Sequence, residues 1–193
     1  MLRRPMLLLP VLLAACATSP PADLYTLAAI PGTALPTARR SIELRRIGLA
    51  GYLDRPEIVR AAVDYRLQVS DRDRWGESLG RMVGRVLTED LVQRLPDAAV
   101  FAESGAISTQ PDTILEIDIA RFDADSAGTV VLLAQVAIRH DGTRIAATAR
   151  TVRLTAAVPG PRAADLVATM STLLAQLADG VARMLAEEKP LRK

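Results

Sequence analysis

Alternating apolar and polar residues fill the region from 113 to 157 and constrain the fold of this 193-residue chain more than any other feature. In its first part, leucine and isoleucine alternate with two acidic residues, which is typical of a strand with one buried face. Apolar residues then recur at every second position from 130 to 138. The pair Asp141-Gly142 favours a tight hairpin turn into a third strand over 143–154. We therefore predict an antiparallel meander of three strands.

Two stretches with helical periodicity flank this region. After Gly76, apolar side chains recur at the 3.6-residue spacing of an amphipathic helix, which Pro96 ends. The residues expected on its buried stripe are Leu79, Met82, Val83, Val86, Leu91 and Leu95, and those expected mostly on its outer face are Arg81, Arg85, Glu89 and Arg94. A second amphipathic helix is predicted after Pro159-Gly160-Pro161, with a stripe of Leu166, Met170, Leu173, Leu174, Leu177, Val181 and Leu185.

Shorter strands are predicted at 24–27, 41–49 and 98–102, with two more within 57–69. Aromatic residues make up only 3% of the chain, so the core is expected to consist mostly of Leu, Val, Ile and Ala. No repeat or internal linker divides the sequence. The predicted fold class is α+β: a single domain over 24–188 with a mainly antiparallel sheet and two amphipathic helices packed on it.

The first fifteen residues have the parts of a cleaved signal peptide. Two arginines form a basic start, an apolar run follows from 5 to 13, and the small residues Ala14 and Ala15 come next. A helix that spans a bilayer needs about 18 or more apolar residues, so this run is too short to be a transmembrane anchor. We predict that residues 1–15 are removed.

The sequence Leu13-Ala14-Ala15-Cys16 resembles the lipobox of bacterial lipoproteins. The resemblance implies cleavage between Ala15 and Cys16, diacylglycerol on the Cys16 thiol, and an acyl chain such as palmitate on the new amine. Two or three acyl chains, at about 0.8 kcal/mol per buried CH₂, hold a protein on a membrane for a long time. The alternative is an ordinary secretory signal followed by an incidental cysteine.

Residues 16–23 form a short proline-containing tether between this anchor and the domain. At about 3.3 Å per extended residue, the tether reaches only about 20–25 Å, so the domain is expected to sit close to the membrane. Ala17 follows the cysteine, and in Gram-negative lipoproteins this resembles the signal for sorting to the outer membrane. We therefore expect a location on the periplasmic face of the outer membrane.

The composition is poor in the groups that catalytic and metal sites use. A single cysteine rules out an intramolecular disulfide or a CxxC site, and a single histidine leaves few ligands for zinc. Without the two leader arginines, basic and acidic residues are equal in number, so the one-signed field of a nucleic-acid-binding protein is missing. We expect no metal, no cofactor and no nucleic-acid partner.

One motif resembles that of an enzyme. Gly76-Glu77-Ser78-Leu79-Gly80 matches G-x-S-x-G, the nucleophile elbow of α/β-hydrolases. That elbow needs a strand before the serine and a histidine base nearby. Here no parallel-sheet pattern precedes the motif, and His140 adjoins a predicted hairpin turn where a solvated residue is expected. A helix start with Ser78 as its capping residue is the preferred interpretation, and the protein is predicted not to be an enzyme.

Two short motifs are left unexplained by core periodicity: the loop Tyr52-Leu53-Asp54-Arg55-Pro56, and Trp75. The loop is either a structured turn with an Asp54–Arg55 surface pair or a partner-binding site. Trp75 either packs the helix onto the sheet or anchors an interface, since Trp, Tyr and Arg are enriched in binding hot spots. Arg81 and Arg85 either form a solvated helix face or contact anionic lipid headgroups.

Several of these segments together resemble one family, the ABC-type transport auxiliary lipoproteins that include PqiC and YmbA. The resemblance starts with the lipobox followed at once by Leu24-Tyr25-Thr26-Leu27. It continues with Tyr52-Leu53-Asp54-Arg55-Pro56-Glu57-Ile58-Val59 and with Arg74-Trp75-Gly76-Glu77-Ser78-Leu79 opening a helix. The strand from Asp112 to Phe122, after a helix that ends at Leu95-Pro96, completes it.

The resemblance implies a non-enzymatic outer-membrane partner of an MCE-domain lipid transporter, which connects the inner and outer membranes and supports envelope integrity. The implied partners are the MCE-domain protein and the inner-membrane transporter components, and a ring-shaped homo-oligomer is consistent with the same resemblance. The alternative from the residues alone is a lipid-anchored assembly factor or pilot protein for another envelope complex.

We predict that Cys16→Ser releases the protein from the membrane, because no other cysteine is available to carry the lipid. Fractionation of cells that make each form measures this directly. If the Cys16→Ser protein stays with the membranes after a salt wash, the anchor lies elsewhere.

Overall fold

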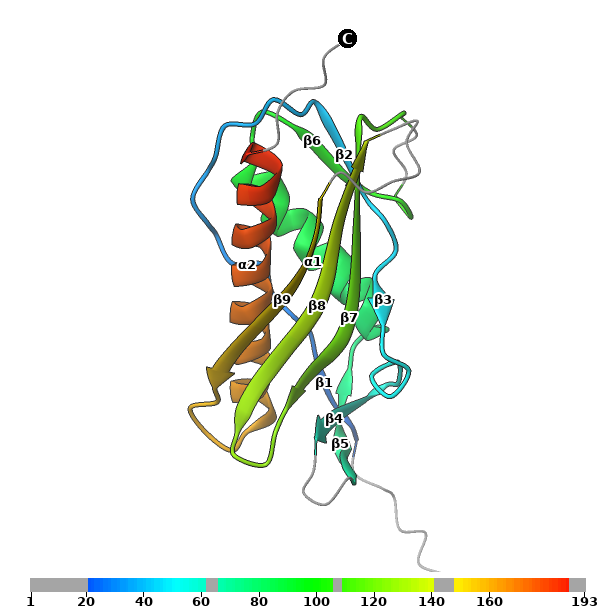
Figure 1. Ribbon diagram of the computed structural model, residues 1–193. Coiled ribbons are helices and arrows are strands. Elements are labelled where there is room, and N and C mark those ends of the chain that lie inside the picture. The colour runs from blue at the N-terminus through cyan, green and yellow to red at the C-terminus, as the bar shows by residue number, and fades with distance from the viewer. Residues whose placement is uncertain (1–20, 62–65, 106–108, 141–147, 188–193) are drawn as a thin grey trace, which may run out of the picture.

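The computed structural model describes residues 21–61, 66–105, 109–140 and 148–187. Its strands and two helices form a single α+β domain, which confirms the predicted fold class (Figure 1). The signal peptide, with Ala15 and Cys16, lies outside the described residues.

The predicted meander is confirmed as three long strands. They are β7 (Thr113–Ala124), β8 (Thr129–His140) and β9 (Thr148–Ala157), and both pairs are antiparallel. The predicted Asp141-Gly142 turn lies outside the described residues. The third strand ends at Ala157, three residues later than the sequence pattern indicated, and its predicted start at 143 also lies outside the described residues.

On the other side of β7 the sheet becomes parallel, which the sequence did not indicate. The segment predicted as one strand over 41–49 is split into β2 (Ser41–Leu44) and β3 (Gly48–Leu49), and both pair in parallel with β7. The short edge strand β6 (Ala99–Ala102) pairs in parallel with β2. The strand order is β6-β2-β7-β8-β9, so the sheet is mixed.

A bulge in β7 decides which side chains face the helices. The register with β8 shifts between Ile119 and Arg121, which inserts one extra residue into β7. Before the bulge, Ile117 and Ile119 contribute to the core, and after it Phe122 does so. Because successive strand residues alternate between faces, the shift turns Arg121 and its neighbour at 123 toward the opposite face of the sheet.

A second, smaller sheet lies at the end of the molecule where the chain leaves toward its N-terminus (Figure 1). Its strands are β1 (Asp23–Tyr25), β4 (Glu57–Ala61) and β5 (Leu67–Trp75), in the order β1-β5-β4. The strands β4 and β5 correspond to the two short strands predicted within 57–69, although β5 continues to Trp75, and they pair antiparallel.

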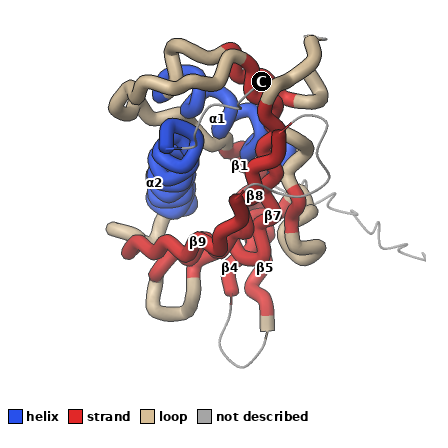
Figure 2. Tube along the Cα trace, turned by 45° about the horizontal axis from the view of Figure 1, so that its top comes forward, coloured by secondary structure: helices blue, strands red, loops and turns tan. Residues whose placement is uncertain are grey.

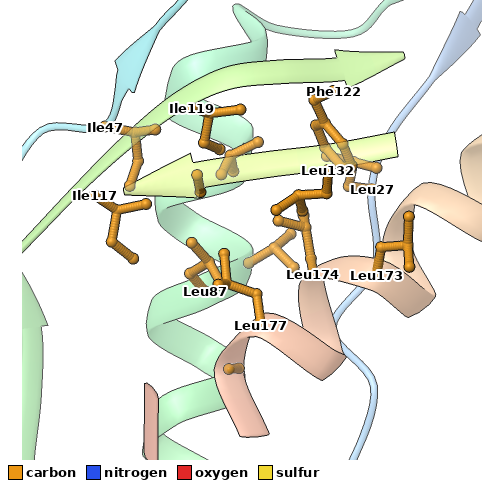
Figure 3. Packing of buried hydrophobic residues seen from close by; sticks show 14 of the residues in the cluster. Leu27, Ile47, Leu87, Ile117, Ile119, Phe122, Leu132, Leu173, Leu174 and Leu177 are labelled. Carbon is orange, nitrogen blue, oxygen red and sulfur yellow. The ribbon is translucent and has the colours of Figure 1, made fainter. Parts of the chain in front are cut away.

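The two predicted helices are confirmed and lie on the same face of the main sheet (Figure 2). Helix α1 (Leu79–Arg94) ends just before Pro96, and α2 (Ala163–Glu187) begins after the proline break. Their apolar stripes meet the inner face of β7 and β8 in one core (Figure 3). At its centre Leu87 of α1 and Leu177 of α2 lie near Ile117 of β7, and all three are almost fully buried.

Arg94 is the main exception to the predicted pattern. The sequence placed it on the outer face of α1, but only 1% of its side chain is exposed. Its guanidinium donates to the Asp179 carboxylate of α2 at 2.6 Å and to the backbone carbonyls of Ile30 and Ala175. It also lies 3.4 Å from the carboxylate of Asp90, one turn earlier in α1. The prediction failed because these partners are far from Arg94 in the sequence.

The segment before β2 is held over this guanidinium. The Ile30 amide donates to the Asp90 carboxylate at 2.9 Å, and the Leu35 amide donates to the Arg94 carbonyl at 2.7 Å. A Cβ on Gly32 would lie 2.3 Å from the guanidinium carbon of Arg94, so only glycine leaves room there. Burial raises the pKa of Asp90, against the opposing effects of the Ile30 amide and the Arg94 charge.

We predict that Arg94→Met lowers the free energy of unfolding by about 3–5 kcal/mol, because it leaves the Asp90 carboxylate buried without its cation. Without Arg94, the pKa of Asp90 in the folded state rises further. A carboxyl group whose pKa is higher in the folded state stabilises the fold at pH values below its unfolded pKa. That stabilisation is lost as the pH rises through its folded pKa. In urea denaturation, the loss of unfolding free energy in the variant relative to the unmodified protein is therefore expected to be larger at neutral pH than at acidic pH.

The control is Arg85→Met, which removes an exposed ion pair from the same helix and is expected to change the denaturation midpoint little. Equal losses in both variants, or an Arg94→Met deficit that does not vary with pH, would contradict this role for the buried cluster.

Candidate functional site

The structure brings the two unexplained motifs together at one corner of the molecule. The backbone amide of Trp75 donates to the carbonyl of Pro56 at 2.7 Å, and Arg74 pairs with Glu57 across β4 and β5. The loop Tyr52–Pro56 therefore rests on the end of β5, next to the start of α1. We name these residues, 52–56 and 75, the corner loop.

The members of the corner loop differ in how much surface they offer. Leu53 and Trp75 are only 2% and 6% exposed and belong to the hydrophobic core. Asp54, Arg55 and Pro56 are exposed. The expected Asp54–Arg55 pair does not form, because Arg55 lies 3.8 Å from Glu57 instead. A partner that binds at this corner therefore has Asp54, Arg55 and Pro56 available to it.

Tyr52 attaches the corner loop to the outer face of the main sheet. Its hydroxyl donates a hydrogen bond to Asp123, the residue that the bulge in β7 turns outward. The other oxygen of the Asp123 carboxylate accepts from Arg121 at 2.9 Å. Burial raises the pKa of Tyr52 above its ordinary value of 10.0, and the hydrogen bond and negative charge of Asp123 raise it further.

A groove of about 1070 Å³ begins beside Asp54 and runs along the outer face of α1. One wall is α1, and the other is the chain from Leu44 to Leu49 with the end of β6. Small residues of α1 at four-residue intervals, Gly80, Gly84 and Thr88, line the helix side. The groove was not predicted from the sequence, although the G-x-x-x-G spacing in α1 is a pattern that could have indicated it.

Packing does not require glycine at the two groove positions. A Cβ on Gly84 would lie 3.6 Å from Ile47 Cγ1, and one on Gly80 would lie 4.0 Å from the Ile47 carbonyl oxygen, both ordinary contacts. Glycine inside a helix costs about 1 kcal/mol relative to alanine. The chain therefore carries two destabilising residues that keep the groove deep.

Four arginines and four acidic residues line the groove, and some of them form ion pairs. Arg85 pairs with Glu77 at 3.0 Å, and Arg45 lies 3.4 Å from Glu103. Arg81 also lines the groove, and its side chain forms no ion pair with the residues that the structure describes. The solvated helix face predicted for Arg81 and Arg85 is thus one side of a groove.

The G-x-S-x-G motif lies in a context that differs from the prediction. β5 ends at Trp75, three residues before Ser78, and pairs in parallel with β1, so a strand does precede the motif. Ser78 occupies the N-cap position of α1, but its side chain forms no capping hydrogen bond. His140 is half-buried rather than solvated, and it lies at the far end of β8 from the start of α1 (Figure 1).

Within the described ranges, no group of three or more His, Cys, Asp or Glu side chains is arranged to hold a metal ion. Neither helix there has the length and apolarity that crossing a membrane requires.

Residues 25–182 match the family described as the ABC-type transport auxiliary lipoprotein component. The chain belongs to this family. Its members are auxiliary components of ABC-type transport, and a lipoprotein family agrees with a membrane-anchored periplasmic protein. No curated protein matches the sequence.

Solved structures share the fold of this family member. Protein XCC0632 from Xanthomonas campestris superimposes with a TM-score of 0.72 at 19% identity, over 85% of this chain and 95% of that one. Another uncharacterised protein gives a TM-score of 0.72 at 18% identity, over 86% and 99% of the two chains.

We predict that Tyr52→Phe lowers the free energy of unfolding by about 1–2 kcal/mol, since the buried Asp123 carboxylate loses a donor. The pKa of Tyr52 is raised in the folded state. Its contribution to stability is therefore fully present below the unfolded pKa of about 10 and is lost as the pH rises through the folded value. Urea denaturation of both proteins is expected to give a constant difference up to about pH 10 and a smaller one above it. A difference that grows above pH 10 would contradict this.

Proposed function

We propose that this protein is a non-enzymatic docking component of an MCE-type lipid transport system, held by lipid on Cys16 to the periplasmic face of the outer membrane. The observation that carries the proposal is the family match over residues 25–182 to an auxiliary transport component. The lipobox that precedes the matched region, with Ala17 after the cysteine, supports the anchor and the choice of membrane.

The length of the tether supports a docking role. Asp23, where β1 begins, is seven positions after Cys16, and an extended chain over those seven steps spans about 25 Å at most. A domain held so close to one membrane does not cross the periplasm itself. The MCE-domain protein and the inner-membrane components therefore have to reach it.

A non-enzymatic role agrees with the chemistry of the described surface. Ser78 lies near Glu77 and two arginines of the groove rim, whereas His140 is at the far end of a strand. Neither the groove nor the corner loop contributes a histidine or a cysteine among the described residues. The chemistry they offer is charge, hydrogen bonding and apolar surface, which suits binding.

We assign the corner loop, through its exposed residues Asp54, Arg55 and Pro56, to the contact with the partner. These residues adjoin the groove, which Asp54 also lines. They stand on a rigid base, because Leu53 and Trp75 are in the core and Tyr52 is bonded to Asp123. A rigid base reduces the conformational entropy that binding would otherwise cost.

The test is a double charge reversal, Asp54→Arg with Arg55→Asp, which keeps the net charge and leaves buried side chains unchanged. We expect this variant to fold and localise normally but to lose co-purification with the MCE-domain protein. A matched control is Arg183→Glu with Glu187→Arg, which reverses two exposed charges near the end of α2 and is expected to co-purify fully.

Two results would contradict parts of this assignment. Full co-purification of the corner-loop variant would show that the loop is only a turn. Failure of the unmodified protein to co-purify with any MCE-domain protein would overturn the proposed partner.

A further inference from the structure

The small sheet exposes apolar side chains that the proposed docking function does not use. Among the described residues, four large apolar side chains are strongly exposed, and three of them belong to this sheet. Leu24 of β1 is 69% exposed, and Leu67 and Val69 of β5 are 46% and 38% exposed. The fourth, Val92, lies on α1. Exposed apolar groups gathered in one element indicate a surface with a binding role.

The exposed apolar side chains lie on two adjacent strands of the small sheet. Leu67 and Val69 are two residues apart in β5, and residues two apart in a strand point to the same face. Leu24 belongs to the neighbouring strand β1, where it pairs with Arg74 of β5. The register of β5 with β4 shifts between Glu57 and Val59, so alternation does not relate the face of Leu24 to that of Val69. The three side chains are therefore grouped by their exposure and by their place on the adjacent strands β1 and β5.

This sheet is the part of the domain from which the tether leaves. β1 runs parallel to β5, with Asp23 beside Asp73, so the chain before Asp23 leaves in the direction in which β5 begins. Figure 1 shows β1, β4 and β5 together at one end of the molecule. Leu67 lies six residues before Asp73, so β5 extends up to about 20 Å beyond the start of β1.

One arginine without an ion pair to the described residues lies beside the apolar side chains at the start of β5, whereas the exposed Asp71 lies further along the same strand. Arg72 and Arg74 are paired with Asp23 and Glu57. Arg66 is exposed beside Leu67, and its side chain forms no ion pair with a described residue. Basic residues close to a membrane surface are attracted to its anionic headgroups.

We propose that the exposed apolar side chains of the small sheet, Leu24, Leu67 and Val69, rest in the headgroup region of the bilayer and orient the anchored domain. The inference depends on the proposed lipid anchor at Cys16, which brings this apolar surface within reach of the membrane. The contact covers the exposed apolar groups. It keeps the C-terminal end of α2, at the other end of the molecule, away from the lipid. The groove and the corner loop are then presented to the periplasm in a fixed orientation.

The test uses the mature lipoprotein in vesicles of phosphatidylethanolamine and phosphatidylglycerol. The thiol of Cys16 is consumed by its lipid, so a newly introduced cysteine is the one free thiol of the chain. Leu67→Cys and Leu24→Cys are each labelled with an environment-sensitive fluorophore. Val92→Cys is the matched control, because Val92 is 46% exposed like Leu67 but lies on α1. Thermal unfolding checks that each variant is folded.

We expect the labels at 67 and 24 to be quenched severalfold more by spin-labelled lipid than the label at 92, and to be less accessible to iodide in solution. Labels at 67 and 24 that remain as accessible to iodide as the label at 92, on protein that floats with the vesicles, would overturn the contact and leave the anchor intact. Protection from iodide without quenching by spin-labelled lipid would show that protein, not lipid, covers this apolar surface. Protein that fails to float would overturn the anchor, and the contact with it.

Discussion

A single buried cation holds the two helices and the chain around them in place. The guanidinium of Arg94 is surrounded by Asp90 of its own helix, Asp179 of α2 and the carbonyl of Ile30. A buried charge is tolerated only when its hydrogen-bonding capacity is met, so these partners have to occupy fixed positions. The α1–α2 packing, the path of residues 30–35 and the absence of a side chain at Gly32 all follow from that requirement.

With the core side of α1 fixed in this way, its outer side is left free to form a groove. Gly80 and Gly84 keep the groove open at a cost in helix stability that no packing contact explains. Residues that lower stability without a packing reason are often retained for function. The groove meets the corner loop at Asp54, so one of the two unexplained sequence motifs and this groove belong to one surface.

The bulge in β7 links the core to that surface. One extra residue near Ala120 returns Phe122 to the core and turns Asp123 outward, where it accepts the Tyr52 hydrogen bond. The small sheet continues from the corner loop toward the tether through β4 and β5. In the proposed arrangement, the small sheet lies next to the membrane and the proposed docking surface lies further from it, which suits an anchored component of a transport system.

Local pattern was sufficient to predict much of this protein. The period of two over 113–138 predicted the meander, and the period of 3.6 after Gly76 and Pro161 predicted both helices, because these signals involve neighbours in the chain. The leader, the cysteine and the short motifs similarly indicated the family that residues 25–182 confirm. In each case the physical cause acts over a few residues.

Only the tertiary structure decided the features that depend on distant contacts. Arg94 has the spacing of a surface residue, yet partners 64 and 85 positions away bury it. The sequence left both core packing and an interface open for Trp75, and packing placed it in the core together with Leu53 of the corner loop. The parallel pairing of β2 with β7 and the bond from Tyr52 to Asp123 also join residues about 70 positions apart. The sequence by itself determined which elements form, through local periodicity and turn chemistry. Which polar groups are buried, which strands pair in parallel and which surface is hollowed were decided by long-range packing, for which a chain carries no local signal.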